Sequence, residues 1–139
     1  VRLLYFDICS IAQNHFNDQP PCHLLGHRLF DRFVKLAENM SVVERQVAWY
    51  ADQIGVTGKH LSEIVKQVSG RTASEWIRSF AVANIKNMLI NTDMSAKEIA
   101  TAMHFSSQSM FTKFFSNATG YSPSAFRTIV RQQNRQHND

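Results

Sequence analysis

The chain has 139 residues, 44% of them apolar and 19% charged, a size and composition that suit one folded domain and exclude a disordered or fibrous chain. No apolar run reaches the roughly 18 residues that would span a bilayer, so we expect a cytoplasmic protein without a membrane partner. Fifteen lysines and arginines against eleven aspartates and glutamates give a net charge of +4, which only mildly favours a polyanionic partner.

The first predicted helix covers residues 1–16, with Val1, Leu4, Ile8 and Ile11 on one side. Tandem prolines interrupt the pattern within residues 17–22, where we place a linker. The chain starts with valine rather than methionine, so we expect a further domain upstream.

The cysteines and histidines near the start form no known metal-binding pattern. Cys9 and Cys22 are expected to be free thiols, since no other cysteine could pair with them to staple a core. Cys22 and His23 could bind a metal together with His27, but a fourth ligand is missing, and a polar linker is the simpler interpretation. We expect no metal and no cofactor.

The rest of the chain has helical periodicity throughout, and no stretch shows the two-residue alternation of a strand. We therefore expect an all-α fold: two helix-turn-helix subdomains joined by a long central helix, with the extra N-terminal helix before them. The predicted helices after the linker span residues 28–39, 45–54, 58–69, 73–91, 96–103, 107–118 and 123–134. The polar end, residues 132–139, is expected to fray.

Helix ends are marked by particular residues. Thr72 with Glu75, and Ser95 with Glu98, have the spacing of capping boxes, in which a hydroxyl and a carboxylate satisfy free backbone N–H groups. Ser122 precedes Pro123, a favourable first helical residue. Two glycines suit the left-handed residue that ends a helix, Gly70 and Gly120.

The chain contains an internal repeat at an offset of 50 residues. The segment 61–76 aligns with 111–126, and the shared apolar positions are 61, 64, 65, 68 and 76 with 111, 114, 115, 118 and 126. Both glycines and a serine coincide as well. Agreement over this length predicts two copies of one unit.

The first copy has the pattern of two helices joined by a tight turn. Ala51 allows the helices to cross closely, and Gly55 permits the turn four residues later. Thr57 can cap the second helix. That helix is left with a polar outer face of Lys59, His60, Ser62, Glu63 and Lys66, a face that fits the major groove of DNA.

In the second copy Ala100 keeps the spacing, but His104 stands where the glycine would be and must adopt a positive φ. The outer face here consists of Ser107, Gln108, Ser109, Thr112 and Lys113. The connecting segment 73–91 would be roughly 28 Å long as a helix. Successive major-groove faces lie about 34 Å apart, so one chain could read two neighbouring grooves of an asymmetric site of roughly 15 to 20 base pairs.

A wider set of residues has a familiar spacing: Tyr50-Ala51-Asp52, Gly55-Val56, His60-Leu61-Ser62, Gly70, Asn91-Thr92-Asp93, Glu98-Ile99-Ala100, Phe105-Ser106, Phe111, Phe114-Phe115, Thr119-Gly120 and Ser122-Pro123-Ser124-Ala125-Phe126-Arg127. With this set, the region from about Arg28 to Arg131 resembles the DNA-binding domain of the AraC/XylS family of bacterial transcription regulators. The family usually has an arginine at the position of Ala81 and often a basic residue at that of Glu63.

The resemblance implies base contacts from Lys59, Ser62 and Glu63 in the first unit and from Gln108, Ser109 and Lys113 in the second. Contacts with the DNA backbone are expected from Thr57, Lys66, Arg71, Ser74, Lys97, Ser107, Thr112 and Arg127. The cations among them could instead simply solvate outer faces. We expect the first unit to discriminate among sequences and the second to contribute at least as much binding energy.

The resemblance also implies an upstream ligand-sensing or dimerising domain. Residues 1–27 would be its last helix and linker, and residues 28–139 the tandem DNA-binding domain. The first helix would form a homodimer contact or pack on the upstream core, and the regulator would activate transcription together with RNA polymerase.

The sequence allows three other interpretations. His60 and His104 have no accompanying nucleophile, paired carboxylate or phosphate loop, so we do not expect an enzyme. The phenylalanines at 105, 111, 114, 115 and 126 could stack on single-stranded bases, but their helical spacing favours a core. The functional alternative is a helical protein-interaction module or anti-activator that keeps the fold without specific DNA binding.

Overall fold

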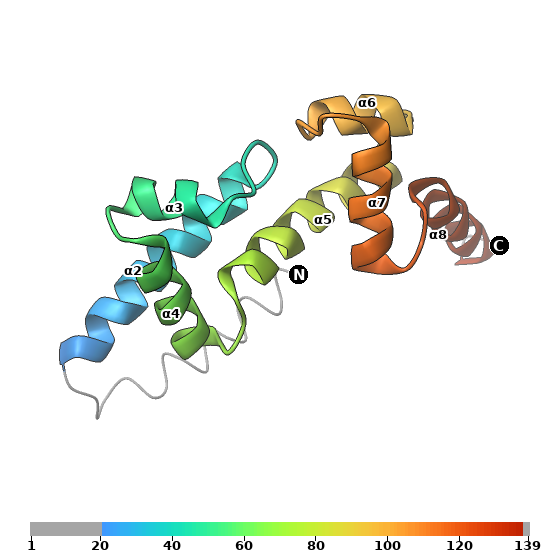
Figure 1. Cartoon of the computed structure of the whole chain (residues 1–139). Coiled ribbons are helices and arrows are strands. Elements are labelled where there is room, and N and C mark those ends of the chain that lie inside the picture. The colour runs from blue at the N-terminus through green and yellow to red at the C-terminus, as the bar shows by residue number, and fades with distance from the viewer. Residues whose placement is uncertain (1–20, 138–139) are drawn as a thin grey trace. The chain divides into compact units, whose positions relative to one another are not determined.

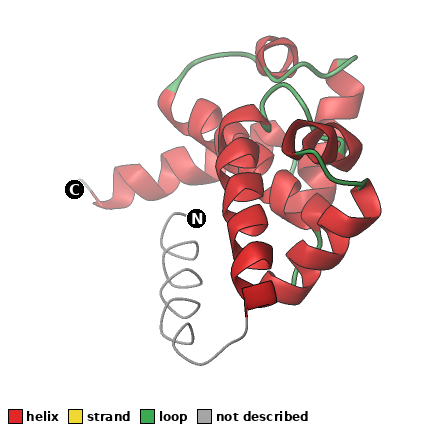
Figure 2. Ribbon diagram, turned by 90° about the vertical axis from the view of Figure 1, so that its left-hand side faces the viewer, coloured by secondary structure: helices red, strands yellow, loops and turns green. Residues whose placement is uncertain are grey.

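The computed structural model describes residues 21–137, and this part of the chain consists of helices joined by short loops, without a strand (Figure 1, Figure 2). The helices are α2 (Pro21–Met40), α3 (Val47–Ile54), α4 (Gly58–Ser69), α5 (Ala73–Asn91), α6 (Ala96–Ala102), α7 (Gln108–Thr119) and α8 (Pro123–His137). The all-α prediction is confirmed. None of the helices in the described part is long and apolar enough to cross a membrane.

Two expectations at the ends of the chain need correction. Helix α2 begins at Pro21, seven residues before the predicted start at residue 28, because a proline at the first helical position loses no hydrogen bond. Helix α8 continues to His137 instead of fraying after residue 134, with Arg135 and His137 in its last turn, where cations are favourable. The predicted helix 1–16 and the first residues of the linker lie outside the described residues.

The chain divides into two compact units. Unit 1 comprises residues up to Met40 together with Glu44–Ile77, and unit 2 comprises Ser41–Val43 and the residues from Arg78 onward. Helix α5 contributes its first residues to unit 1 and the remainder to unit 2.

In unit 1 the helices α2, α3 and α4 pack against one another in all three pairs. The core side of α2 carries Phe30, Phe33, Val34 and Ala37, at the spacing of one helix face. The ring of Phe33 meets that of Tyr50 edge to face, with centroids 5.7 Å apart. The other buried residues of this core are Ala51, Ile54, Leu61, Ile64, Val65, Ala73, Trp76 and Ile77.

Tyr50 brings one polar atom into this core. Its side chain is buried, and its hydroxyl donates a hydrogen bond of 2.7 Å to the backbone carbonyl of Glu44. Burial, followed by the nearby charge of Glu44, raises the pKa of Tyr50 to about 12. The phenol therefore stays protonated and keeps its role as a donor in the loop before α3.

Unit 2 has a separate core, built from α5, α6 and α7, against which α8 packs through Phe126. Its buried residues are Ala81, Val82, Ile85, Leu89, Ile99, Ala100, Met103, Phe111 and Phe115. The five repeated phenylalanines belong to this cluster: Phe111 and Phe115 are fully buried, and Phe105, Phe114 and Phe126 pack against them. The prediction that they form a core is confirmed.

The predicted helix ends are confirmed as well. Both capping boxes form, with reciprocal hydrogen bonds between Thr72 and Glu75 and between Ser95 and Glu98. The hydroxyl of Ser122 accepts from the backbone N–H of Ala125 at 3.2 Å. Left-handed glycines follow α4 and α7, with φ of 73° at Gly70 and 80° at Gly120.

Candidate nucleic-acid interface

The turn between the helices of each unit determines where the second helix lies. In unit 1 Gly55 has a φ of 84°, and the N–H of the following Val56 donates to the carbonyl of Ala51 at 3.0 Å. In unit 2 His104 has a φ of 56°, and Phe105 donates to Ala100 at 2.9 Å. The histidine thus adopts the backbone conformation of the glycine, as predicted, and the two units share one turn geometry.

Helix α4 presents a polar outer face in unit 1. Its inner positions Leu61, Ile64 and Val65 are buried, and the predicted base-contacting residues Lys59, Ser62 and Glu63 are all exposed. Thr57 caps the helix by accepting from the N–H of His60 at 3.1 Å. A hydroxyl can accept and donate at once, so the cap leaves the O–H of Thr57 available.

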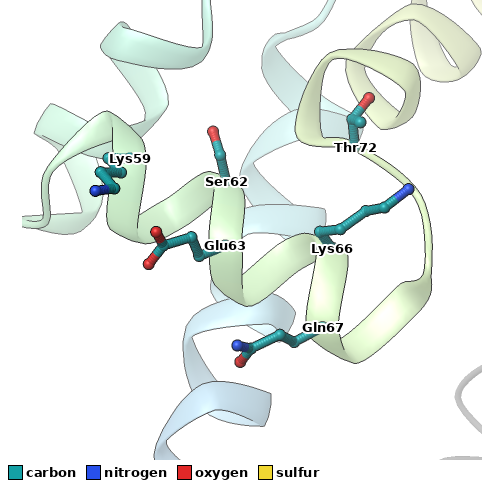
Figure 3. Close-up of a pocket in the computed structure, with 6 residues that line it drawn as sticks. All are labelled: Lys59, Ser62, Glu63, Lys66, Gln67 and Thr72. Carbon is teal, nitrogen blue, oxygen red and sulfur yellow. The ribbon is translucent and has the colours of Figure 1, made fainter.

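The outer face of α4 borders a surface depression that reaches the loop before α5 (Figure 3). The depression is lined by Lys59, Ser62, Glu63, Lys66, Gln67 and Thr72. Gln67 and Thr72 were not among the predicted site residues. Gln67 follows Glu63 by one helical turn, and this spacing was the signal that could have identified it.

Two cations of unit 1 are already held by other groups. The ammonium of Lys66 donates to the carbonyl of Gly70 at 3.0 Å, beyond the end of α4, and Figure 3 shows its side chain extending along that end of the helix. The guanidinium of Arg71 lies 4.8 Å from the centre of the Trp76 ring and donates to the carbonyl of Glu75 at 3.4 Å. A phosphate contact from either residue has to compete with these interactions.

Helix α7 presents the corresponding face in unit 2. Ser107 caps it by accepting from the N–H of Met110 at 3.2 Å. The predicted base-contacting residues Gln108, Ser109 and Lys113 are exposed, and Thr112 is half-buried. Met110 is also 54% exposed on the first turn, although the sequence pattern had not marked it as a surface residue.

The remaining predicted backbone contacts differ in their surroundings. Ser74 and Lys97 are exposed. Arg127 is half-buried, and its guanidinium donates to the carbonyls of Leu89 at 3.0 Å and Thr92 at 3.4 Å. Ala81 is fully buried in the core of unit 2, so this position offers no side chain for a phosphate contact.

Among the described residues, no group of three or more histidine, cysteine, aspartate or glutamate side chains gathers in a way that could hold a metal ion. Of the three candidate ligands, Cys22, His23 and His27, the side chains of Cys22 and His23 are not described.

Two helix-turn-helix units, each with a buried inner face and a polar outer face on its second helix, define a protein of the tandem helix-turn-helix class. Residues 50–129 match the family described as a helix-turn-helix domain, of the AraC type. The chain belongs to the AraC/XylS family of DNA-binding transcription regulators.

Two curated relatives are 32% and 28% identical to the chain over the aligned residues. It is 32% identical to the uncharacterized HTH-type transcriptional regulator YfiF of Bacillus subtilis over 111 residues, which are 80% of this chain and 35% of YfiF. It is 28% identical to the HTH-type transcriptional regulator ExsA of Pseudomonas aeruginosa, over 74% of this chain and 37% of ExsA. The chain therefore spans a little over a third of the length of these relatives.

Solved structures have the same fold. The DNA-binding domain of AdpA, determined in complex with a target DNA, superimposes with a TM-score of 0.68 at 20% identity, covering 77% of this chain and 96% of that one. The C-terminal domain of AraT from Geobacillus stearothermophilus gives a TM-score of 0.67 at 22% identity, covering 73% and 84%.

Proposed function

We propose that the chain binds an asymmetric double-stranded DNA site by inserting α4 and α7 into neighbouring major grooves. The observation that carries this proposal is the division of each helix into two faces. The inner positions of each helix, Leu61, Ile64 and Val65 in α4 and Phe111 and Phe115 in α7, are buried within their own units. The polar residues expected to meet bases are exposed. A helix of this kind fits the major groove, about 12 Å wide.

The chemistry of the exposed side chains suggests what each unit reads. In unit 2, Gln108 can form two hydrogen bonds with adenine, and Lys113 can donate to guanine. In unit 1, Lys59 can likewise donate to guanine, and Glu63 can accept from the amino group of cytosine. Ser62 and Ser109 can bond to several bases and so select less strongly.

Contacts with phosphates would position the two helices and supply much of the affinity. The residues proposed for this role are Thr57, Lys66, Arg71, Ser74, Lys97, Ser107, Thr112 and Arg127. Ser74, Lys97 and Ser107 are exposed, which favours them for this role over the partly engaged cations.

The complete regulator is proposed to act in the cytoplasm as a transcription activator that recruits RNA polymerase. Support comes from relatives that are named as activators, among them the virulence regulon transcriptional activator VirF of Yersinia enterocolitica, 29% identical over 74% of this chain. An upstream domain would sense a ligand, and residues 1–16 would contribute to a homodimer.

Selection from a random duplex library tests DNA recognition directly. We expect enrichment of one asymmetric motif, and an affinity for it that falls steeply as the salt concentration rises. If no motif is enriched and affinity is equal for all duplexes at every salt concentration, the protein-interaction module or anti-activator is the correct function.

Alanine at Gln108 or at Lys113 tests the role of α7. Each change should weaken binding to the selected duplex by about 1 to 3 kcal/mol, the range of a good base contact. The matched control is Lys35→Ala, which removes an exposed cation from α2 outside both recognition faces. If Lys113→Ala and the control lose the same amount of binding free energy, the loss in Lys113→Ala comes from the change in net charge and not from a base contact.

A further inference from the structure

Met110 is an apolar side chain on an otherwise polar recognition face. It belongs to the first turn of α7, and 54% of its surface is exposed, while the neighbouring Phe111 is fully buried. Lys113 follows it by three residues and Asn117 by a further four, and both are exposed. Residues at this spacing share one side of a helix, so Met110 lies beside the proposed base contacts.

The first turn of α7 is held in place around this residue. The N–H of Met110 donates to the hydroxyl of Ser107 at 3.2 Å, which ties the residue to the start of the helix. The first residues of a recognition helix are those that enter the groove most deeply. Met110 therefore lies in the part of α7 that would contact base edges, and its backbone is held by a hydrogen bond.

The internal repeat shows that an apolar residue is not required at this position. The equivalent residue of unit 1 is His60, ten residues before Gly70, as Met110 is before Gly120. His60 is polar and exposed on the outer side of α4. The fold of this unit therefore accepts a polar residue at this position and does not require an apolar one.

We infer that Met110 is a specificity-determining residue that contacts the C5 methyl group of a thymine. This inference rests on the proposed binding of α7 in a major groove. Among the base edges of that groove, the thymine methyl is the one apolar group, and apolar side chains read it by contact. A methionine side chain is unbranched and adaptable, which suits contact with a single methyl group.

The experiment compares four affinities, using the duplex that the wild-type chain selects. Selection with Met110→Ala should lose preference at one position of the motif, and that position should be a thymine. Replacing this thymine by uracil removes only the methyl group. The wild type should then bind about three- to five-fold more weakly, the effect of one buried methyl-sized group. Met110→Ala should show a similar loss on the thymine duplex and no further loss with uracil.

Two variants serve as controls. Met110→Leu keeps an apolar contact and should retain sensitivity to uracil. His60→Ala alters the equivalent position of unit 1 and should retain it fully. The thermal unfolding midpoint of each variant checks that the fold is intact, which is expected because both residues are exposed.

The outcomes separate this inference from the proposed function. If the wild type selects a motif but no thymine-to-uracil change alters its affinity, or if Met110→Ala remains as sensitive as the wild type, the methyl contact is wrong and DNA recognition stands. An unchanged affinity of Met110→Ala on the thymine duplex would point to a protein contact instead. If the wild type selects no motif, both fail.

Discussion

The guanidinium of Arg127, a residue of α8, lies at the carboxyl end of α5. Its Nε donates to the carbonyl of Leu89 and its Nη2 to that of Thr92. The last carbonyls of a helix lack partners within the helix and carry the negative end of its dipole. A guanidinium satisfies both needs at once. Because it comes from α8, Arg127 also joins the last helix to the core of unit 2.

Arg127→Ala is expected to lower the free energy of unfolding by about 1 to 3 kcal/mol, since it removes charge-assisted hydrogen bonds to half-buried carbonyls. Urea unfolding followed by circular dichroism measures the loss. The control is Arg131→Ala, which breaks one exposed ion pair with Asp93, 2.6 Å long, and should cost less than about 1 kcal/mol. If Arg131→Ala lowered the free energy of unfolding more than Arg127→Ala, the stabilising role of Arg127 would be contradicted.

His104 is the one described residue other than glycine with a positive φ, 56°. We expect His104→Asn to lower the free energy of unfolding less than most other substitutions at this position, because asparagine tolerates a positive φ. His104→Val should be less stable than His104→Asn by about 1 to 2 kcal/mol, since a branched residue is strained there. Both variants lose the imidazole, so their difference in thermal or urea unfolding isolates the backbone. Equal stabilities would show that the turn relaxes.

At the scale of helices, a hydroxyl cap marks the start of each recognition helix. Thr57 and Ser107 cap the two recognition helices, and Ser95 and Glu98 form the box before α6. The carboxylate of Glu98 accepts from the backbone N–H of Ser95 at 2.6 Å. This bond, followed by that with the Ser95 hydroxyl, lowers the pKa of Glu98.

The capping box predicts a dependence of stability on pH. A carboxyl whose pKa is lower in the folded chain stabilises the fold above its unfolded pKa, and the contribution disappears as the pH falls through the folded pKa. NMR titration should show a lower pKa for Glu98 in the wild type than in Ser95→Ala. The variant should also lose less stability on acidification over this range. Identical titration curves would contradict a contribution of the Ser95 hydroxyl to the lowered pKa of Glu98.

At the scale of the whole molecule, two units with separate cores each supply one recognition helix. The proposal that α4 and α7 read neighbouring major grooves requires half-sites about one helical turn apart on the duplex. Neither unit alone accounts for a long asymmetric site.

Five base pairs inserted between the halves of the selected motif would turn one half to the opposite side of the duplex. We expect affinity to fall at least about tenfold, or about 1.4 kcal/mol, because only one helix can then reach its bases. An insertion of ten or eleven base pairs is the control for spacing alone. Fluorescence anisotropy at fixed salt concentration measures each case, and equal affinity for all duplexes would show that the units bind independently.

Several features of the interface could be predicted because they depend on neighbours within a few residues. The bounds of α4 and α5 agree with the prediction, and the cap at Thr57 and the left-handed conformation of Gly70 follow from local hydrogen bonding. The exposure of Gln108 and Lys113 follows from helical periodicity around the buried Phe111.

Other features depend on residues far apart in the chain. Arg127 was predicted as a phosphate contact. Nothing in the sequence indicated that its guanidinium donates to carbonyls 35 and 38 residues away in the chain. The exposure of Met110 was missed because apolar residues in a helix ordinarily face the core.

The sequence by itself thus determined the helices, their caps, the repeated turn and the family, since each depends on spacing along the chain. Tertiary structure alone decided which cations are already occupied, that Ala81 lies inside unit 2 and that Met110 faces outward. The physical reason is that burial and side-chain partners are set by packing between helices, and the positions of those partners in the chain follow no fixed period.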